Sequence, residues 1–199
     1  MEYIQHLCKD KKLRKLLEEQ DALVLENRKK IYLRLCASIM SQQLSTKVAE
    51  VIYNRFLALY GKKEPTAQQI VDTPFETLRS IGLSNAKTNY VHNVCRFFIE
   101  EKITDAQLYK MSNEEVITKL TQIKGVGKWT TEMILMFSLQ HEDVFPVDDL
   151  GIQLAMTKLY KLDHSNKKIL YEQMHKVAEK WRPYRTYACI HLWRWKDGG

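Results

Sequence analysis

The sequence has few of the residues that interrupt helices. Among its 199 residues there are only seven glycines and four prolines. Apolar residues recur at helical spacing along almost the whole chain, and the alternation typical of strands is hard to find. The pattern therefore predicts an all-α fold.

Cysteine is also scarce, and its positions argue against two kinds of metal site. The four cysteines are Cys8, Cys36, Cys95 and Cys189, with no short spacing between any two of them. Zinc sites and iron–sulfur clusters need closely spaced ligands, so we expect neither. Separate, reduced thiols are typical of cytosolic proteins.

Long apolar runs are missing as well. No stretch approaches the roughly 18 apolar residues that a membrane span needs. The residues from Met1 to His6 lack the apolar core of a secretory signal. We therefore expect a soluble, intracellular protein that does not associate with membranes.

Acidic residues are outnumbered by basic ones. Lys and Arg total 31 against 24 Asp and Glu, which gives a net charge of +7. This balance favours a polyanionic partner, although solvated basic faces are common in proteins that have none. A length of 199 residues is enough for one large domain or two small lobes.

The most informative stretch begins at Leu120 and ends at Asp149. Gly125 and Gly127 stand one residue apart between two helical apolar patterns, which predicts a tight turn between helices. The second helix is expected to begin at about Gly127, where its free N–H groups and Lys128 form a ready anion site. The glycines alone are explained equally well by an ordinary helix–helix turn.

Two carboxylates follow this turn. Asp148 and Asp149 come after a Phe145-Pro146 break, at the opening of the next predicted helix. Capping a helix is the commoner role for acids at such a position. Capping and catalysis are compatible, because a helix N-terminus keeps a carboxylate ionised. An anion-binding turn followed by a placed carboxylate suggests chemistry on a phosphate-bearing polymer.

The C-terminal third is rich in aromatic residues. They are Trp129, Trp181, Tyr184, Tyr187, Trp193 and Trp195. Most are expected in the core, but a site that extrudes a base needs aromatic faces, which attract cationic rings. Gln42 and Gln43, at a helix end, are either a polar boundary or amides that can fill the gap left by an extruded nucleotide. His191 is expected to be a hydrogen-bonded core residue rather than a metal ligand.

These residues resemble the helix-hairpin-helix, Gly/Pro-rich loop, Asp superfamily of DNA glycosylases. The stretches that carry the resemblance are 123–130 (IKGVGKWT) and 145–149 (FPVDD). Supporting matches lie at 41–45, 78–87 and 181–193, in the family's order. Within the superfamily the likeness is greatest to the DNA-3-methyladenine glycosylase II branch.

The resemblance implies a two-lobed helical fold with the active site in the cleft between the lobes. The central helical lobe is expected to span residues 28–130 and to end in the hairpin. The chain ends, 1–27 plus 131–199, are expected to form the second lobe. Neither an iron–sulfur cluster nor any required cofactor is implied.

The resemblance also implies roles for particular residues. Asp149 falls on the family's essential aspartate, and Gln43, with Gln42 beside it, falls on the residue that wedges into the duplex. The base pocket is expected to include Trp193, Trp129 and Tyr187. The DNA phosphates are expected at Gly125, Val126, Gly127, Lys128 and Thr130. A structural sodium or potassium ion would be held by the backbone carbonyls of Thr121, Ile123 and Val126.

The implied activity is that of a monofunctional DNA glycosylase. It would release alkylated purines, of the 3-methyladenine and 7-methylguanine type, from double-stranded DNA. Branches that also cut the strand carry a lysine where this chain has Trp129, so no lyase activity is expected. We expect a monomer in the cytoplasm, at a bacterial nucleoid, or in a eukaryotic nucleus.

Two alternatives stay open at this point. The same fold could act on another lesion, such as uracil, hypoxanthine or an oxidised purine. The chain could also be a helix-hairpin-helix module that binds DNA without catalysis. Asp149 and Trp193 argue against such a module, because binding alone requires neither.

Overall fold

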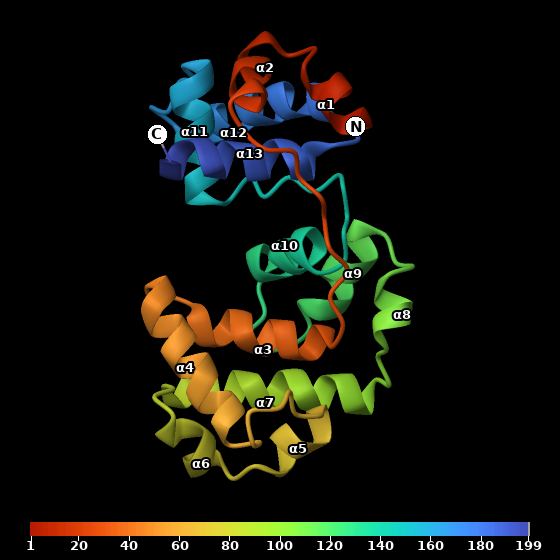
Figure 1. Ribbon diagram of the computed structural model, residues 1–199, viewed down its shortest axis with the longest axis vertical. Coiled ribbons are helices and arrows are strands. Elements are labelled where there is room, and N and C mark those ends of the chain that lie inside the picture. Colours follow the sequence, from red (N-terminus) through yellow and green to blue (C-terminus); the bar gives the residue numbers. More distant parts are fainter. Residues whose placement is uncertain (199) are drawn as a thin grey trace. The chain divides into compact units, whose positions relative to one another are not determined.

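The computed structural model describes residues 1–198, and these form helices and loops without strands (Figure 1). The predicted all-α fold is therefore confirmed. The chain divides into two compact units. Unit 2 comprises Asn27–Leu139, and unit 1 comprises Met1–Glu26 together with the described residues from Gln140 onward.

Unit 2 is built around two long helices that lie side by side. Its helices are α3 (Ile31–Ser41), α4 (Thr46–Ala58), α5 (Ala67–Asp72), α6 (Phe75–Ser80), α7 (Asn85–Glu100), α8 (Asp105–Leu108), α9 (Asn113–Leu120) and α10 (Lys128–Phe137). Helix α3 packs along α7, as Figure 1 shows, while α4 and α10 pack against α3 and α5 and α6 against α7. Apolar side chains at helical spacing, such as Leu35 and Ile39 of α3, are fully buried in this core.

Local caps set most helix starts in unit 2. The N-cap side chains that accept a backbone N–H from the following helix belong to Ser45, Thr66, Ser84, Thr104 and Ser112. Ser112 and Glu115 form a capping box, in which each side chain accepts a backbone N–H of the other residue. Each cap replaces a hydrogen bond that the first helical turn cannot make, and contributes about 1 kcal/mol.

Unit 1 gathers both ends of the chain. Its elements are α1 (Glu2–Leu7), α2 (Lys11–Glu18), α11 (Leu150–Tyr160), α12 (Lys167–Ala178), the short 3-10 helix η1 (Glu179–Trp181) and α13 (Arg185–Gly198). Helix α13 packs against α11 and α2. Trp181 is completely buried in this unit, and α2 begins at the cap formed by Asp10.

The predicted boundaries of the two units need one correction. The first boundary lies within a residue of the prediction, but the second lies at Leu139 rather than at 130. Helix α10 therefore belongs to unit 2, because it packs against α9 and α3. Packing between distant segments decides this boundary, and the glycine turn before α10 does not reveal it.

His191 is the core residue that the sequence predicts. It is 1% exposed, and its Nδ1 lies 2.8 Å from Oε1 of Gln20. The amide nitrogen of Gln20 donates to the carbonyl of His191, so Oε1 is the acceptor and Nδ1 carries the proton. Burial, with the charge of Arg194 second, lowers the pKa of His191 to about 4. Among the described helices, none is long and apolar enough to cross a membrane.

Candidate functional site

A tight turn joins α9 to α10, and Gly125 is the residue that permits it. Gly125 has a φ of +106°, a conformation that side chains disfavour. A Cβ at this position would lie 2.2 Å from Cγ of Tyr90, so the tyrosine ring fills the space that a side chain would need. Ile123 and Val126 are buried beneath the turn. The turn is therefore fixed by its backbone and by Tyr90.

Gly127 serves a different purpose from Gly125. It is the N-cap of α10 with a φ of −94°, which any residue can adopt, and a Cβ there would meet nothing within 4 Å. No side chain caps the first turn of α10 at this residue. A bare N-cap lets an anion approach the first amides of a helix closely.

Two side chains at the start of α10 refine the predicted anion site. The Lys128 side chain is 54% exposed, and its Nζ lies 3.6 Å from Oε1 of the buried Glu132. Thr130 is 3% exposed, so its contribution to an anion site is its backbone N–H and not its hydroxyl. The turn thus offers backbone donors with one cation beside them.

The backbone carbonyls predicted for a monovalent ion lie in this same turn. The carbonyl of Ile123 accepts the N–H of Val126 at 2.9 Å, which leaves one lone pair on that oxygen. Together with Thr121, this set consists only of hard, neutral oxygen donors. Such donors fit an alkali cation, which is a proposal taken up below.

Asp149 is the N-cap of α11, in unit 1, and unlike Gly127 it caps its helix with its own side chain. Its Oδ1 accepts the N–H of Ile152 and the indole Nε1–H of Trp193, each at 2.9 Å. The predicted cap is therefore present, and a second donor fixes the same oxygen. Two converging donors restrict the carboxylate to one orientation.

Gly151 makes room for this pair and was missed by sequence reasoning. A Cβ on Gly151 would lie 3.0 Å from Oδ1 of Asp149 and 3.0 Å from Nε1 of Trp193. A glycine in a helix costs about 1 kcal/mol relative to alanine. A glycine in the first turn of the apolar helix α11 is the sequence feature that could have indicated this close packing.

Asp148 has contacts of its own that separate it from Asp149. Its Oδ1 accepts the hydroxyl of Tyr171 at 2.8 Å, and Nζ of Lys167 lies 3.9 Å away. Gln153 donates to the carbonyl of Val147 at 2.9 Å. Asp148 thus anchors the turn to α12, whereas Asp149 is the acid paired with Trp193.

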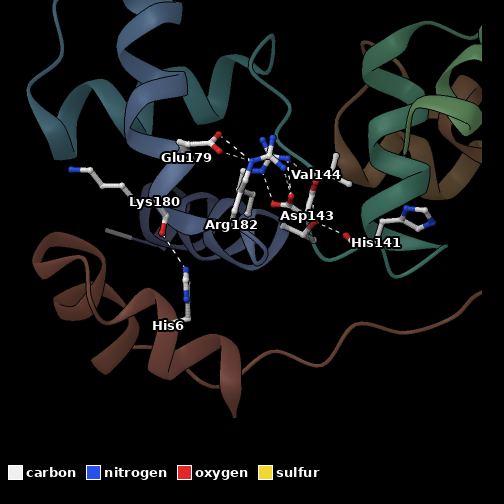
Figure 2. A network of polar contacts seen from close by, with 9 residues as sticks. His6, His141, Asp143, Val144, Glu179, Lys180 and Arg182 are labelled. Atoms are coloured by element: carbon white, nitrogen blue, oxygen red, sulfur yellow. Dashed lines mark hydrogen bonds and ion pairs between the residues drawn. The ribbon is translucent and has the colours of Figure 1, made fainter. Parts of the chain in front are cut away.

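A network of charged residues holds the segment that leads to Asp149 (Figure 2). Arg185 binds Asp143 with two nitrogens, Nε at 2.6 Å and Nη2 at 2.9 Å. Nη1 of Arg182 lies 2.6 Å from Oδ2 of the same carboxylate. Thr186 accepts the N–H of Val144 at 3.0 Å and donates to the carbonyl of His141 at 2.5 Å. Residues 141–144 are therefore fixed to the start of α13.

The predicted wedge residues follow the end of α3. Gln43 has a φ of +58°, the left-handed conformation that costs a non-glycine residue about 1 kcal/mol, and its side chain is exposed. Gln42 is the C-cap of α3 and is half-buried. The structure therefore presents Gln43, rather than Gln42, to solvent at the apex of a turn.

The chain is similar to known proteins both in sequence and in fold. Residues 36–183 match the family model of the HhH-GPD superfamily base excision DNA repair proteins. The chain belongs to this superfamily. The predicted resemblance and the two-lobed helical fold are thereby confirmed.

Several members of the superfamily are similar along most of the chain. DNA-3-methyladenine glycosylase 1 of Schizosaccharomyces pombe is 38% identical over 169 residues, which cover 84% of this chain and 73% of that protein. The structure of the Schizosaccharomyces pombe 3-methyladenine DNA glycosylase Mag1 in complex with abasic DNA matches with a TM-score of 0.83 and 33% identity. That match covers 98% of this chain and 96% of that chain.

A second structure and a more distant relative carry related names. The DNA-3-methyladenine glycosidase of Bacillus halodurans matches with a TM-score of 0.82 and 34% identity, over 96% of this chain and 87% of that chain. DNA-3-methyladenine glycosylase 2 of Escherichia coli is 22% identical over 165 residues, which cover 78% of this chain and 54% of that protein.

One predicted pocket residue, Tyr187, packs within unit 1. Tyr187 stacks on Tyr3 with ring centres 4.0 Å apart, and its hydroxyl donates to Glu142 at 2.8 Å. The cavity of about 560 Å³ that it lines is bordered by neither Asp149 nor Trp193. Six positions along a helix turn a side chain by about 240°, so Tyr187 and Trp193 face different sides of α13. We therefore assign Tyr187 to the packing of α1 against α13.

Trp129 follows the glycine turn directly, at the start of α10. It is the second residue of α10, in unit 2, and is 41% exposed. An indole at this position has no amine that could act as a nucleophile toward a sugar carbon.

Proposed function

We propose that this protein is a monofunctional DNA glycosylase of base excision repair. It hydrolyses the N-glycosidic bond of alkylated purines, of the 3-methyladenine and 7-methylguanine type, in double-stranded DNA. The similar proteins named as 3-methyladenine DNA glycosylases or glycosidases support the substrate class. The observation that carries the proposal is the Asp149 carboxylate, oriented by Ile152 and Trp193 at a helix start.

The turn between α9 and α10 supplies the proposed contact with the DNA backbone. Backbone amides of Gly127 and of the first turn of α10, with Lys128 beside them, would hold a phosphate. An alkali cation on the carbonyls of Thr121, Ile123 and Val126 would stiffen the turn and add positive charge. Because these contacts displace counterions, affinity should fall steeply as salt increases.

Hydrolysis of the N-glycosidic bond of these lesions does not require a general acid. A purine methylated at a ring nitrogen carries a positive charge, so it leaves as a neutral base without prior protonation. Breaking the bond builds positive charge on the sugar, and the negative charge of Asp149 stabilises it or orients the attacking water. This hydrolysis requires no redox group and no metal.

Two further side chains serve the extruded nucleotide in this proposal. The indole of Trp193 would stack on the cationic base, an interaction that favours charged over neutral lesions. Gln43 would enter the gap in the duplex and delay the return of the base. With Trp129 where a strand-cutting branch has a lysine, base removal proceeds without strand cleavage.

The substrate also fixes where the protein would act. Chromosomal DNA places it at the nucleoid of a bacterium or in the nucleus of a eukaryote. One duplex requires one copy of the chain, so the proposed active form is a monomer.

A base-release assay on defined duplexes tests the proposal. We expect release of 3-methyladenine and 7-methylguanine from double-stranded DNA, with no strand break until the product is treated with alkali. Matched duplexes that carry uracil or an oxidised purine should react far more slowly. Preferred release of a neutral lesion would move the function to another branch of the superfamily, and binding without any release would contradict catalysis.

A further inference from the structure

A lysine from another helix closes the end of α3, immediately before Gln43. Nζ of Lys87, in the first turn of α7, donates to the carbonyl of Met40 at 3.0 Å and to the carbonyl of Gln42 at 2.7 Å. The two contacts join residues 47 and 45 positions apart in the sequence. Lys87 is half-buried, and desolvation lowers the pKa of its ammonium group.

This lysine stands at an unfavourable place for its own helix. The N-terminus of a helix carries partial positive charge, so a cation in its first turn is destabilising there. No carboxylate lies within ion-pair distance of Lys87 among the residues that the structure describes. Its charge instead faces the carbonyls at the C-terminal end of α3, which carry partial negative charge. The unfavourable interaction of the Lys87 charge with the N-terminus of α7 is thus offset by its hydrogen bonds to the carbonyls at the end of α3.

Each backbone carbonyl from Ile39 to Gln42 has a hydrogen-bond donor. The carbonyl of Ile39 accepts the N–H of Gln42, and that of Ser41 accepts the N–H of Leu44. The two remaining oxygens, on Met40 and Gln42, are the ones that Lys87 binds. Removal of Lys87 would leave two partly buried acceptors without their protein donor.

The turn also holds a strained residue that needs such support. Gln43 keeps a φ of +58°, which costs about 1 kcal/mol for a residue with a side chain. A strained conformation persists only where the surrounding contacts determine it. The carbonyl that Lys87 binds at 2.7 Å belongs to Gln42, so the contact fixes the peptide that joins Gln42 to Gln43.

We propose that Lys87 is a positioning residue that fixes the turn of Gln43 so that its side chain can enter the duplex. This inference rests on the proposed function, since it assumes that Gln43 is the wedge. Lys87 acts through the backbone of the turn and need not contact DNA itself.

A fluorescence measurement on a modified duplex tests this role. The duplex carries a stable abasic analogue with 2-aminopurine opposite it, and insertion of a wedge unstacks the 2-aminopurine and raises its emission. We expect Lys87→Met to lower the emission rise at saturating protein as much as Gln43→Ala does. Single-turnover release of 3-methyladenine should fall about tenfold, because the charge-assisted hydrogen bond that fixes the peptide before Gln43 is lost. Lys87→Arg should restore most of both signals.

The double variant distinguishes an indirect role from a direct DNA contact. If Lys87 acts through Gln43, Lys87→Met with Gln43→Ala behaves like Gln43→Ala alone, because the two losses are not additive. A lysine that binds a phosphate would instead give additive losses and a lower salt dependence of binding. Additive losses would overturn the inference.

Lys30→Met is the matched control. Lys30 precedes the same helix α3 at its other end, and its Nζ donates to the carbonyl of Glu64 at 3.1 Å. The variant removes the same charge and should leave the 2-aminopurine signal unchanged. If Lys87→Met does not fold, as judged by circular dichroism, Lys87→Gln takes its place under the same non-additivity requirement.

The outcomes also separate this inference from the proposed function. A full emission rise with Gln43→Ala would show that Gln43 is not the wedge, and would remove the premise. Loss with Gln43→Ala but not with Lys87→Met would overturn the role of Lys87 alone. Base release by the unmodified protein tests the glycosylase activity independently of both.

Discussion

Two connections between helices carry the residues of interest, and they are held in different ways. The turn from 121 to 127, in unit 2, is fixed by the left-handed Gly125, by the ring of Tyr90 and by buried apolar side chains. The segment from 141 to 149, in unit 1, is fixed by side chains that reach it from α13, above all Arg185 and Trp193. A contact with a uniform phosphate backbone can be built from main-chain amides, whereas a placed carboxylate needs directed partners.

Substitutions in the two connections should therefore differ in how much stability they remove. In the first connection the shape depends on Gly125, which has no side chain. Adding a single methyl group at this position should therefore reduce stability severely. In the second connection several hydrogen bonds share the task, so each loss should be smaller and should act on rate as well as on stability.

Gly125→Ala should be the most damaging change in the turn. The new Cβ would lie 2.2 Å from Tyr90 at a φ of +106°, so overpacking and backbone strain add to about 3 kcal/mol of lost stability. Urea denaturation measures this loss directly. Gly127→Ala is the control, because its Cβ would meet nothing within 4 Å and its φ is ordinary. Equal losses for the two alanines would contradict the account of the turn.

Arg185→Lys should loosen the segment that leads to Asp149. Lysine keeps the charge but cannot bind Asp143 with two nitrogens, so stability should fall by about 2 kcal/mol and base release should slow. The side chain of Arg185 is 13% exposed, whereas that of Arg182 is 47% exposed. Arg182→Lys should therefore cost less in both thermal denaturation and single-turnover kinetics. The reverse ranking would count against the network as the anchor of this segment.

Trp193→Phe removes one of the two donors to Asp149 and keeps an aromatic face. Single-turnover base release should fall about tenfold, corresponding to about 1.4 kcal/mol for one hydrogen bond to a charged group. Trp193→Ala should add a further loss that is larger for 3-methyladenine than for neutral hypoxanthine. Equal added losses on the two lesions would exclude a cation–π contribution.

The smallest effect is a pH dependence of stability from His191. Its pKa of about 4 in the folded protein lies below the ordinary value of 6.5, so the unfolded chain binds a proton first as pH falls. The stability from neutral His191 is thus complete above about pH 6.5 and decreases towards pH 4, by about 0.7 kcal/mol between pH 7 and 6. His191→Gln should flatten part of this decrease in urea denaturation. His92 in unit 2, whose pKa is lowered by burial, accounts for a residual slope that the variant keeps. An unchanged slope would contradict the buried, neutral state of His191.

Features that depend on nearby residues were predictable from the sequence. The caps at Ser45, Thr66, Ser84, Thr104 and Ser112 formed because each needs only the next few residues. Asp149 was predicted as a cap for the same reason. Gly125 was predicted to permit a turn, although the position of Tyr90 in the space beside it could not be predicted from local sequence.

Features that depend on distant segments were not predictable in this way. The bond between Trp193 and Asp149 joins residues 44 positions apart, and the contacts of Arg185 with Asp143 span 42 positions. Periodicity placed Trp193 and Tyr187 on one helix, but the stacking of Tyr187 on Tyr3 could not be predicted from it. The end of unit 2 at Leu139 likewise follows from the packing of α10.

Asp149→Asn tests most directly whether the negative charge of Asp149 is required for base release. The amide keeps an oxygen for Ile152 and Trp193 but loses the negative charge. On 3-methyladenine duplexes we expect single-turnover release to fall by about 10²–10³-fold, while binding to an abasic-analogue duplex is retained. Asp148→Asn, which alters the neighbouring acid bound to Tyr171, should retain most activity. Unchanged release by Asp149→Asn would contradict the account.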